Sequence, residues 1–179
     1  RRHDAARKPP RQRAPAAFDL ALFKAGKLEF GGGPQITIPT ATDDLLGTGK
    51  WQAGAAALGI APQSWGLVGG LVTWQHSFAG EGGRPVQNNL QTQPFLIYNL
   101  PEGFYARSTA TLNFNLQTGD YYIPVGFGAG KVWRLNGGTT VNLFVEPQYT
   151  VFHDGVAPHW QIFMGLNLQF PFGHKAGKG

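Results

Sequence analysis

The dipeptide His76-Ser77 is the clearest opportunity for nucleophilic catalysis in this sequence. A serine hydrolase needs an imidazole within hydrogen-bond reach of the serine hydroxyl. Both residues fall in a segment that we interpret as a β-strand, and adjacent strand residues point to opposite faces. They cannot form a dyad with each other, and we expect that the protein is not an enzyme.

Metal binding is the second chemistry that these residue types offer. His153, Asp154 and His159 flank one loop, with Glu146 upstream, and such side chains suit several divalent ions. The pair Asp43-Asp44 offers carboxylates for calcium, but two adjacent carboxylates are a weak signal. Polar loop residues are usually just solvated, so we expect neither a metal site nor a cofactor.

Three glycines at alternate positions, Gly126, Gly128 and Gly130, have the spacing of part of a phosphate-binding loop. That motif has meaning only in a strand–turn–helix context, which this segment lacks. We therefore expect the glycines to let side chains from neighbouring strands approach the wall of a sheet.

The composition indicates a β protein with few charges. The 179 residues include 26 Gly, 13 Phe and no Cys, and only 14% are charged, against about 25% in an average soluble domain. The lack of Cys excludes disulfides and Cys-ligated metals. No run of about 18 apolar residues is present, so we predict no transmembrane helix.

The net charge of +5 belongs to the N-terminal end. Residues 1–14 carry six basic side chains against Asp4, while the remaining residues are neutral overall. Charge and proline together predict a disordered basic tail over 1–16. We expect no nucleic-acid partner, and a second short tail over 173–179.

Period-two alternation dominates the rest of the chain and predicts strands. In 159–172 the even positions are apolar from Trp160 to Phe172, and the odd positions are mostly polar or small. Similar alternation recurs along the chain, although the faces of 65–78 are not evident. We predict nine strands, at about 17–24, 27–39, 49–61, 65–78, 88–100, 103–116, 121–134, 139–152 and 159–172.

These strands predict an antiparallel up-and-down transmembrane β-barrel over 17–172. Most have 12–14 residues, longer than the roughly 5–6 of soluble strands and sufficient for the roughly 9–11 of a membrane strand. Short and longer connections alternate, as in outer-membrane barrels, which also use an even number of strands. We expect nine or ten strands in this chain, with at least one N-terminal strand missing from a barrel of about 12.

The polar faces of the predicted strands supply the candidate functional residues. Side chains on these faces would point into the lumen, where lining charges tune the passage of solutes. The lumen-facing candidates are Arg107, Asn113, Asn115, Arg134, Glu146 and Gln148. The candidates in extracellular loops are Asp43, Asp44, Glu81 and Arg84.

Four segments resemble the phenol-degradation (meta-pathway) outer-membrane protein family, in its C-terminal part. They are Pro39 to Trp51, Trp74 to Gly80, Gln93 to Pro101 and Ile123 to Val132. The resemblance covers about 17–172. It implies a bacterial outer-membrane barrel, in contact with the lipid bilayer, that transports small aromatic or hydrophobic molecules.

The last predicted strand also resembles the signal by which such barrels engage the outer-membrane assembly machinery. The matching residues are Gly165, Leu168, Phe170 and Phe172. Phe163 replaces a polar residue of that pattern, and seven residues follow Phe172. The alternatives to a transporter are a non-conducting structural or surface-binding outer-membrane barrel and a soluble lipocalin-like or lectin-like β protein.

Overall fold

The computed structural model describes residues 16–18, 21–39 and 49–170. Within them one 3₁₀ turn, Pro101–Gly103, accompanies twelve strand segments. These are β1 (Ala16–Phe18), β2 (Ala21–Ala25), β3 (Leu28–Thr37), β4 (Lys50–Gln63), β5 (Gly66–Gly80), β6 (Asn88–Asn99), β7 (Phe104–Ser108), β8 (Leu112–Asn115), β9 (Tyr121–Gly126), β10 (Gly128–Arg134), β11 (Thr140–Asp154) and β12 (Trp160–Gln169). No helix of this described part has the length and apolar character that crossing a membrane requires.

The twelve segments form one antiparallel up-and-down sheet, which confirms the predicted all-β class. β1 and β2 both pair with β3, β7 and β8 both pair with β6, and β9 and β10 both pair with β11. In each couple the second segment keeps the pairing register of the first, so the sheet has the nine strands predicted from the sequence. The ladder is interrupted between β7 and β8 and between β9 and β10, while residues 19–20 lie outside the described part.

These two breaks were not predicted, and contacts in the structure accompany each of them. Between β7 and β8, the backbone N–H of Thr109 donates to the carboxylate of Glu146 at 2.8 Å and so leaves the ladder. Between β9 and β10, Phe127 turns outward as an exposed ring, and its N–H reaches Pro147 O at 3.3 Å. Opposite β9, the register with β11 shifts between Thr150 and Phe152.

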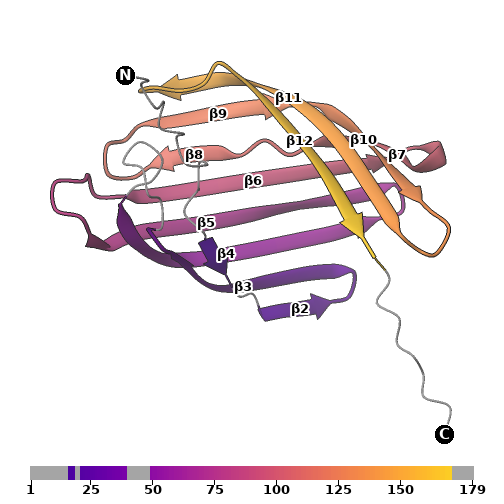
Figure 1. Cartoon of the computed structure of the whole chain (residues 1–179), viewed down its shortest axis with the longest axis horizontal. Coiled ribbons are helices and arrows are strands. Elements are labelled where there is room, and N and C mark those ends of the chain that lie inside the picture. The colour runs from indigo at the N-terminus through magenta and orange to yellow at the C-terminus, as the bar shows by residue number, and fades with distance from the viewer. Residues whose placement is uncertain (1–15, 19–20, 40–48, 171–179) are drawn as a thin grey trace, which may run out of the picture.

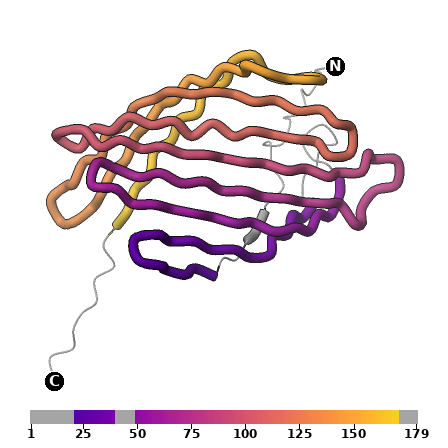
Figure 2. Tube along the Cα trace, turned by 180° about the vertical axis from the view of Figure 1, so that it is seen from behind, coloured from indigo at the N-terminus to yellow at the C-terminus, as the bar shows by residue number. Residues whose placement is uncertain are grey.

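The sheet curls along its length. β12 crosses in front of β5, β6 and β8 in Figure 1 and behind them in Figure 2, so the last strands fold over one face. We call that face concave and the opposite face convex. Among the described residues no pairing joins β12 to β1 or β2, so both edges remain open.

The burial pattern is the reverse of that of a water-soluble sheet. On β11, Glu146, Gln148 and Thr150 point to the concave face and are 0%, 7% and 4% exposed. Their neighbours Val145 and Tyr149 point to the convex face and are 49% and 42% exposed. The polar side chains are thus sheltered and the apolar ones are not.

The same reversal holds on β5, whose faces the sequence did not reveal. Trp74 and Phe78 lie exposed on the convex face, while Ser77 is buried on the concave face. The predicted faces of β12 agree with the pairing register, in which Leu166 and Leu168 lie opposite Leu143 and Val141 of the convex face, whereas Phe163 lies opposite Glu146. Both faces of this edge strand are largely exposed.

Candidate functional site

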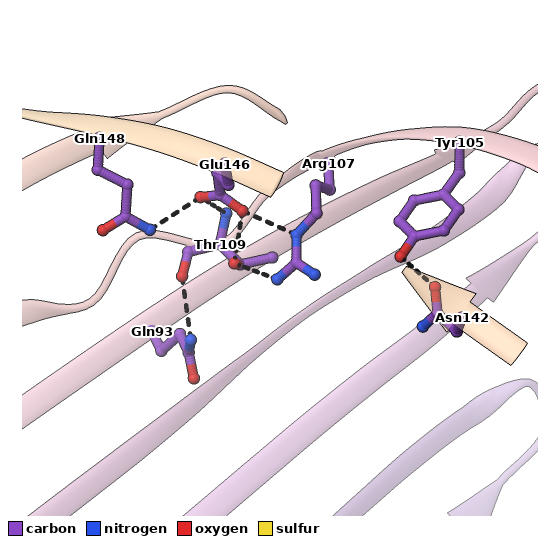
Figure 3. A network of polar contacts seen from close by, with 7 residues as sticks. All are labelled: Gln93, Tyr105, Arg107, Thr109, Asn142, Glu146 and Gln148. Carbon is purple, nitrogen blue, oxygen red and sulfur yellow. Dashed lines mark hydrogen bonds and ion pairs between the residues drawn. The ribbon is translucent and has the colours of Figure 1, made fainter. Parts of the chain in front are cut away.

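A buried carboxylate is the centre of the concave face. Glu146 accepts hydrogen bonds from Arg107 Nε at 2.8 Å, from Thr109 Oγ1 at 2.8 Å and from Gln148 Nε2 at 3.0 Å, besides the Thr109 amide (Figure 3). Arg107 also donates to Thr109 Oγ1 at 2.6 Å. Two charges are thus paired and hydrogen-bonded, as burial of charge requires. The network ties β7 to β11.

The row of alternate glycines makes room for this network. A Cβ on Gly126 would lie 2.5 Å from Glu146 Oε1, and one on Gly128 would lie 2.6 Å from Glu146 Cα. A Cβ on Gly130 would enter the ring of Tyr105. The glycines therefore let side chains lie against β9 and β10, as the sequence indicated.

Aromatic rings hold the guanidinium from the other side. Arg107 Cζ lies 3.8 Å from the centroid of the Phe144 ring and 5.3 Å from that of Phe163. Phe144 occupies space that Gly165 leaves free, since a Cβ there would lie 2.6 Å from the Phe144 ring. Gly165, predicted as part of an assembly signal, thus has a packing role in the structure.

Tyr105 makes a second link across the same face. Its hydroxyl donates to Asn142 Oδ1 at 2.7 Å, and the side chain is buried (Figure 3). Tyr105 and Tyr122 therefore line the concave face, although aromatic residues at strand ends are expected at a membrane interface. Trp74, Trp133 and Trp160 lie exposed on the convex face.

Side-chain amides line a cavity next to the network. It has a volume of about 460 Å³, and its polar wall comprises Gln91, Gln93, Asn113, Gln148, Gln161 and Thr111. Tyr122 and Phe163 supply rings to the same cavity. A second cavity of about 420 Å³ shares Gln91, Asn113 and Tyr122 with it and reaches Asp120 and Asp154. Both volumes fall in the range of ligand pockets, roughly 300–1,000 Å³.

The concave face changes character along the strands. Toward the longer loops it carries amides and hydroxyls, among them Gln52, Gln75 and Asn89. Toward the short turns at 64–65 and 100–103, positions of the same parity carry Leu58, Ile60, Leu67, Phe95 and Ile97. A molecule moving along this face would meet an amide zone and then an apolar zone.

The other lumen-facing candidates lie apart from the Glu146 network. Asn113 accepts from Gln91 and lines both cavities. Asn115 accepts from the backbone N–H of Gln117 and Thr118 and so stabilises the turn after β8. Arg134 lies exposed at the end of β10. The structure therefore brings together Arg107, Glu146 and Gln148.

The structure describes some of the candidates from the extracellular loops and the assembly signal, but not all of them. Arg84 Nε contacts Glu81 Oε2 at 3.1 Å in the loop between β5 and β6. Leu168 and Phe170 are exposed at the end of the last strand. Asp43, Asp44, Phe172 and the predicted tail 173–179 lie outside the described residues, as does the predicted tail 1–16 except for Ala16, which begins β1.

The catalytic and metal-binding residue types do not gather. His76 is exposed and Ser77 is buried on the opposite face. The rings of His153 and His159 lie 5.8 Å apart, whereas Glu146 is engaged by Arg107. Across the described ranges no group of three or more His, Cys, Asp or Glu residues could hold a metal ion.

Sequence reasoning missed Gln91, Gln93 and Thr109 as site residues. Their positions have the parity of the polar face, so alternation could have placed them there. Alternation could not predict which residues they contact. Thr109, for example, binds Glu146, which is 37 residues away in the chain. Comparisons of the chain with protein-family models, with curated proteins and with solved structures each gave no match.

Proposed function

We propose that the chain forms part of the wall of a β-barrel in the bacterial outer membrane, with a passage for small molecules along its concave face. The observation that carries this is the reversed burial on β11, where Glu146, Gln148 and Thr150 are buried while Val145 and Tyr149 are exposed. Exposed apolar side chains in such number mark a surface that contacts lipid or another protein. A sheltered polar face opposite to them is the arrangement of outer-membrane barrels.

The dimensions support a membrane-spanning sheet. β11 has 15 residues, which at about 3.3 Å per residue extend about 50 Å. At a tilt of about 35–45° such a strand spans the roughly 30 Å hydrocarbon core of a bilayer. Phe23 and Trp133 are exposed at the short-turn end, and Phe78 and Trp160 at the loop end, in the positions of interfacial aromatic belts.

The proposed function requires that the sheet closes into a barrel. An open sheet edge in lipid leaves backbone N–H and C=O groups without partners, at a cost of several kcal/mol each. The outer edges of β12 and of β1 and β2 must therefore be covered. Further strands or another copy of the chain can supply that pairing.

The solute that fits the apolar zone is a small, uncharged molecule with an aromatic or hydrophobic part. Leu58, Ile60 and Phe95 offer it an apolar surface, while the amide zone accommodates polar substituents. A small aromatic or hydrophobic solute is also what the family resemblance implies. Assembly machinery of the outer membrane would insert the barrel.

Reconstitution of the full chain tests this function. After incorporation into liposomes, the folded protein should migrate on a gel at a different position before and after boiling, as folded barrels do. The liposomes should swell in isosmotic solutions of small uncharged solutes. A heat-modifiable protein that admits no solute would favour the non-conducting barrel, which the cross-linking of the concave face by Glu146 also fits. A stable monomer without detergent would exclude both.

A further inference from the structure

Four of the five amides that line the 460 Å³ cavity have orientations fixed by hydrogen bonds. Gln93 Nε2 lies 3.0 Å from the carbonyl oxygen of Thr109, and Gln148 Nε2 lies 3.0 Å from the carboxylate of Glu146. Both partners can only accept, so each glutamine must present its N–H₂ group to them. The carbonyl oxygens of these two side chains are thereby left for other donors.

Gln91 is oriented by a relay. Asn113 Nδ2 donates to the carbonyl oxygen of Thr111 at 2.8 Å, which fixes Asn113 Oδ1 as an acceptor. Gln91 Nε2 then donates to that oxygen at 2.7 Å. As with Gln93 and Gln148, one N–H and the carbonyl oxygen of Gln91 remain for a ligand.

Gln35 belongs to the adjoining hollow and contains a buried acceptor. Its Oε1 is buried with no hydrogen-bond partner. The residue lines a hollow of about 230 Å³ that shares Gln91, Gln93 and Thr111 with the amide cavity. A buried polar atom without a partner is rare and is usually satisfied by water or a ligand.

The described residues that line the amide cavity carry no charge, since they supply amide, hydroxyl, aromatic and aliphatic groups. The nearby charges of Arg107 and Glu146 neutralise each other at 2.8 Å. An ion in this cavity would lose hydration without a counter-charge from its wall, since Asp120 and Asp154 line the second cavity instead. An uncharged solute would lose less.

The N–H and the carbonyl oxygen that remain on each glutamine side chain can together bind a hydroxyl group. A hydroxyl both donates and accepts, and each glutamine offers an adjacent carbonyl oxygen and N–H. The rings of Tyr122 and Phe163 provide apolar surface for the faces of a ring-shaped solute. We propose that this cavity binds an uncharged cyclic polyol of the sugar type. The inference rests on the proposed function in treating the concave face as the lumen.

Ligand binding can be measured without transport, on the full chain folded in detergent micelles. Saturation-transfer NMR with glucose should show saturable binding. Glucuronate and glucosamine, which keep the pyranose ring but carry opposite charges, should bind at least about tenfold more weakly. Gln91→Met and Gln93→Met should each weaken glucose binding about tenfold, because each removes a donor and an acceptor. Gln63→Met, the same change at the exposed end of β4, should leave it unchanged.

The possible results separate clearly. Absence of glucose binding, equal binding of the charged analogues, or catechol binding in place of glucose would overturn the inference. Unchanged binding in the two cavity variants would overturn it as well. Should a Met variant fail to fold, Gln93→Asn, which keeps the amide but shortens its reach, replaces it and should also weaken binding. Liposome swelling tests the passage separately, so either claim can fail alone.

Discussion

Arg107 on β7 and Glu146 on β11 form an ion pair of 2.8 Å across the intervening strand β10, over the backbone of Gly128. The missing side chain at Gly128 allows two residues on non-adjacent strands to meet. The Arg107 side chain is 10% exposed and that of Glu146 is 0% exposed. The pair therefore holds β7 to β11 in a sheltered setting.

Glu146→Gln should destabilise the fold by about 3 kcal/mol, because it leaves the guanidinium of Arg107 buried without a counter-charge. The measurement is the midpoint of urea unfolding in detergent. Glu29→Gln is the control, since the Lys24–Glu29 pair on the same sheet is largely exposed at 75% and 37%. Its midpoint should not change. Equal midpoints for both variants would contradict the role of burial.

Gly128→Ala should lower the thermal transition of the folded protein. The new Cβ would lie 2.6 Å from Glu146 Cα, so the backbones of β10 and β11 must separate. Overpacking of this kind costs about 1–3 kcal/mol. Gly59→Ala on β4 is the matched control, because nothing lies within 4 Å of its added Cβ. We expect that control to raise stability by about 0.4–1 kcal/mol through the unfolded state.

Tyr105→Phe should reduce stability by about 1 kcal/mol, since it removes the 2.7 Å hydrogen bond to Asn142. The ring itself stays and continues to cover Gly130. Tyr98→Phe provides the comparison, because that ring is exposed and stacked on Trp65. If chemical denaturation shows the same loss for both variants, the hydrogen bond between Tyr105 and Asn142 does not stabilise the fold.

Leu166→Arg and Asn167→Arg compare neighbouring positions on opposite faces of β12. Leu166 is exposed on the convex face, where arginine in lipid should cost about 2–4 kcal/mol near the bilayer midplane. Asn167 belongs to the concave face, where a charge stays in contact with water. Folding yield into lipid vesicles should fall for the first variant alone. Similar yields would argue against a lipid-facing convex surface.

The number of strands and most of their faces could be predicted, because strand alternation is a local property of the backbone. The even face of 159–172 and the polar face around Gln148 follow from it directly. The breaks at 109–111 and at Phe127 could not be predicted, since the first depends on a carboxylate from a distant strand. Tyr105 shows a further limit, because parity places its ring on the concave face but does not reveal its hydrogen bond to Asn142, 37 residues away in the chain.

The sequence allowed several residues of the candidate site to be identified, but not the contacts between them. Arg107, Glu146 and Gln148 were identified by parity, and the structure places them in one network. Asn115 instead stabilises a turn, and Arg134 lies at a strand end. Which polar residues contact one another depends on strand order and register, and neither is encoded in a single segment.

The most direct test of a lipid-facing convex surface is fluorophore scanning of β12. Because the sequence contains no cysteine, single cysteines at 161–168 can be labelled without background. In proteoliposomes with brominated lipids, quenching should be strong at 162, 164, 166 and 168 and weak at 161, 163, 165 and 167. Quenching without this alternation, or with the opposite alternation, would contradict a lipid-facing convex surface.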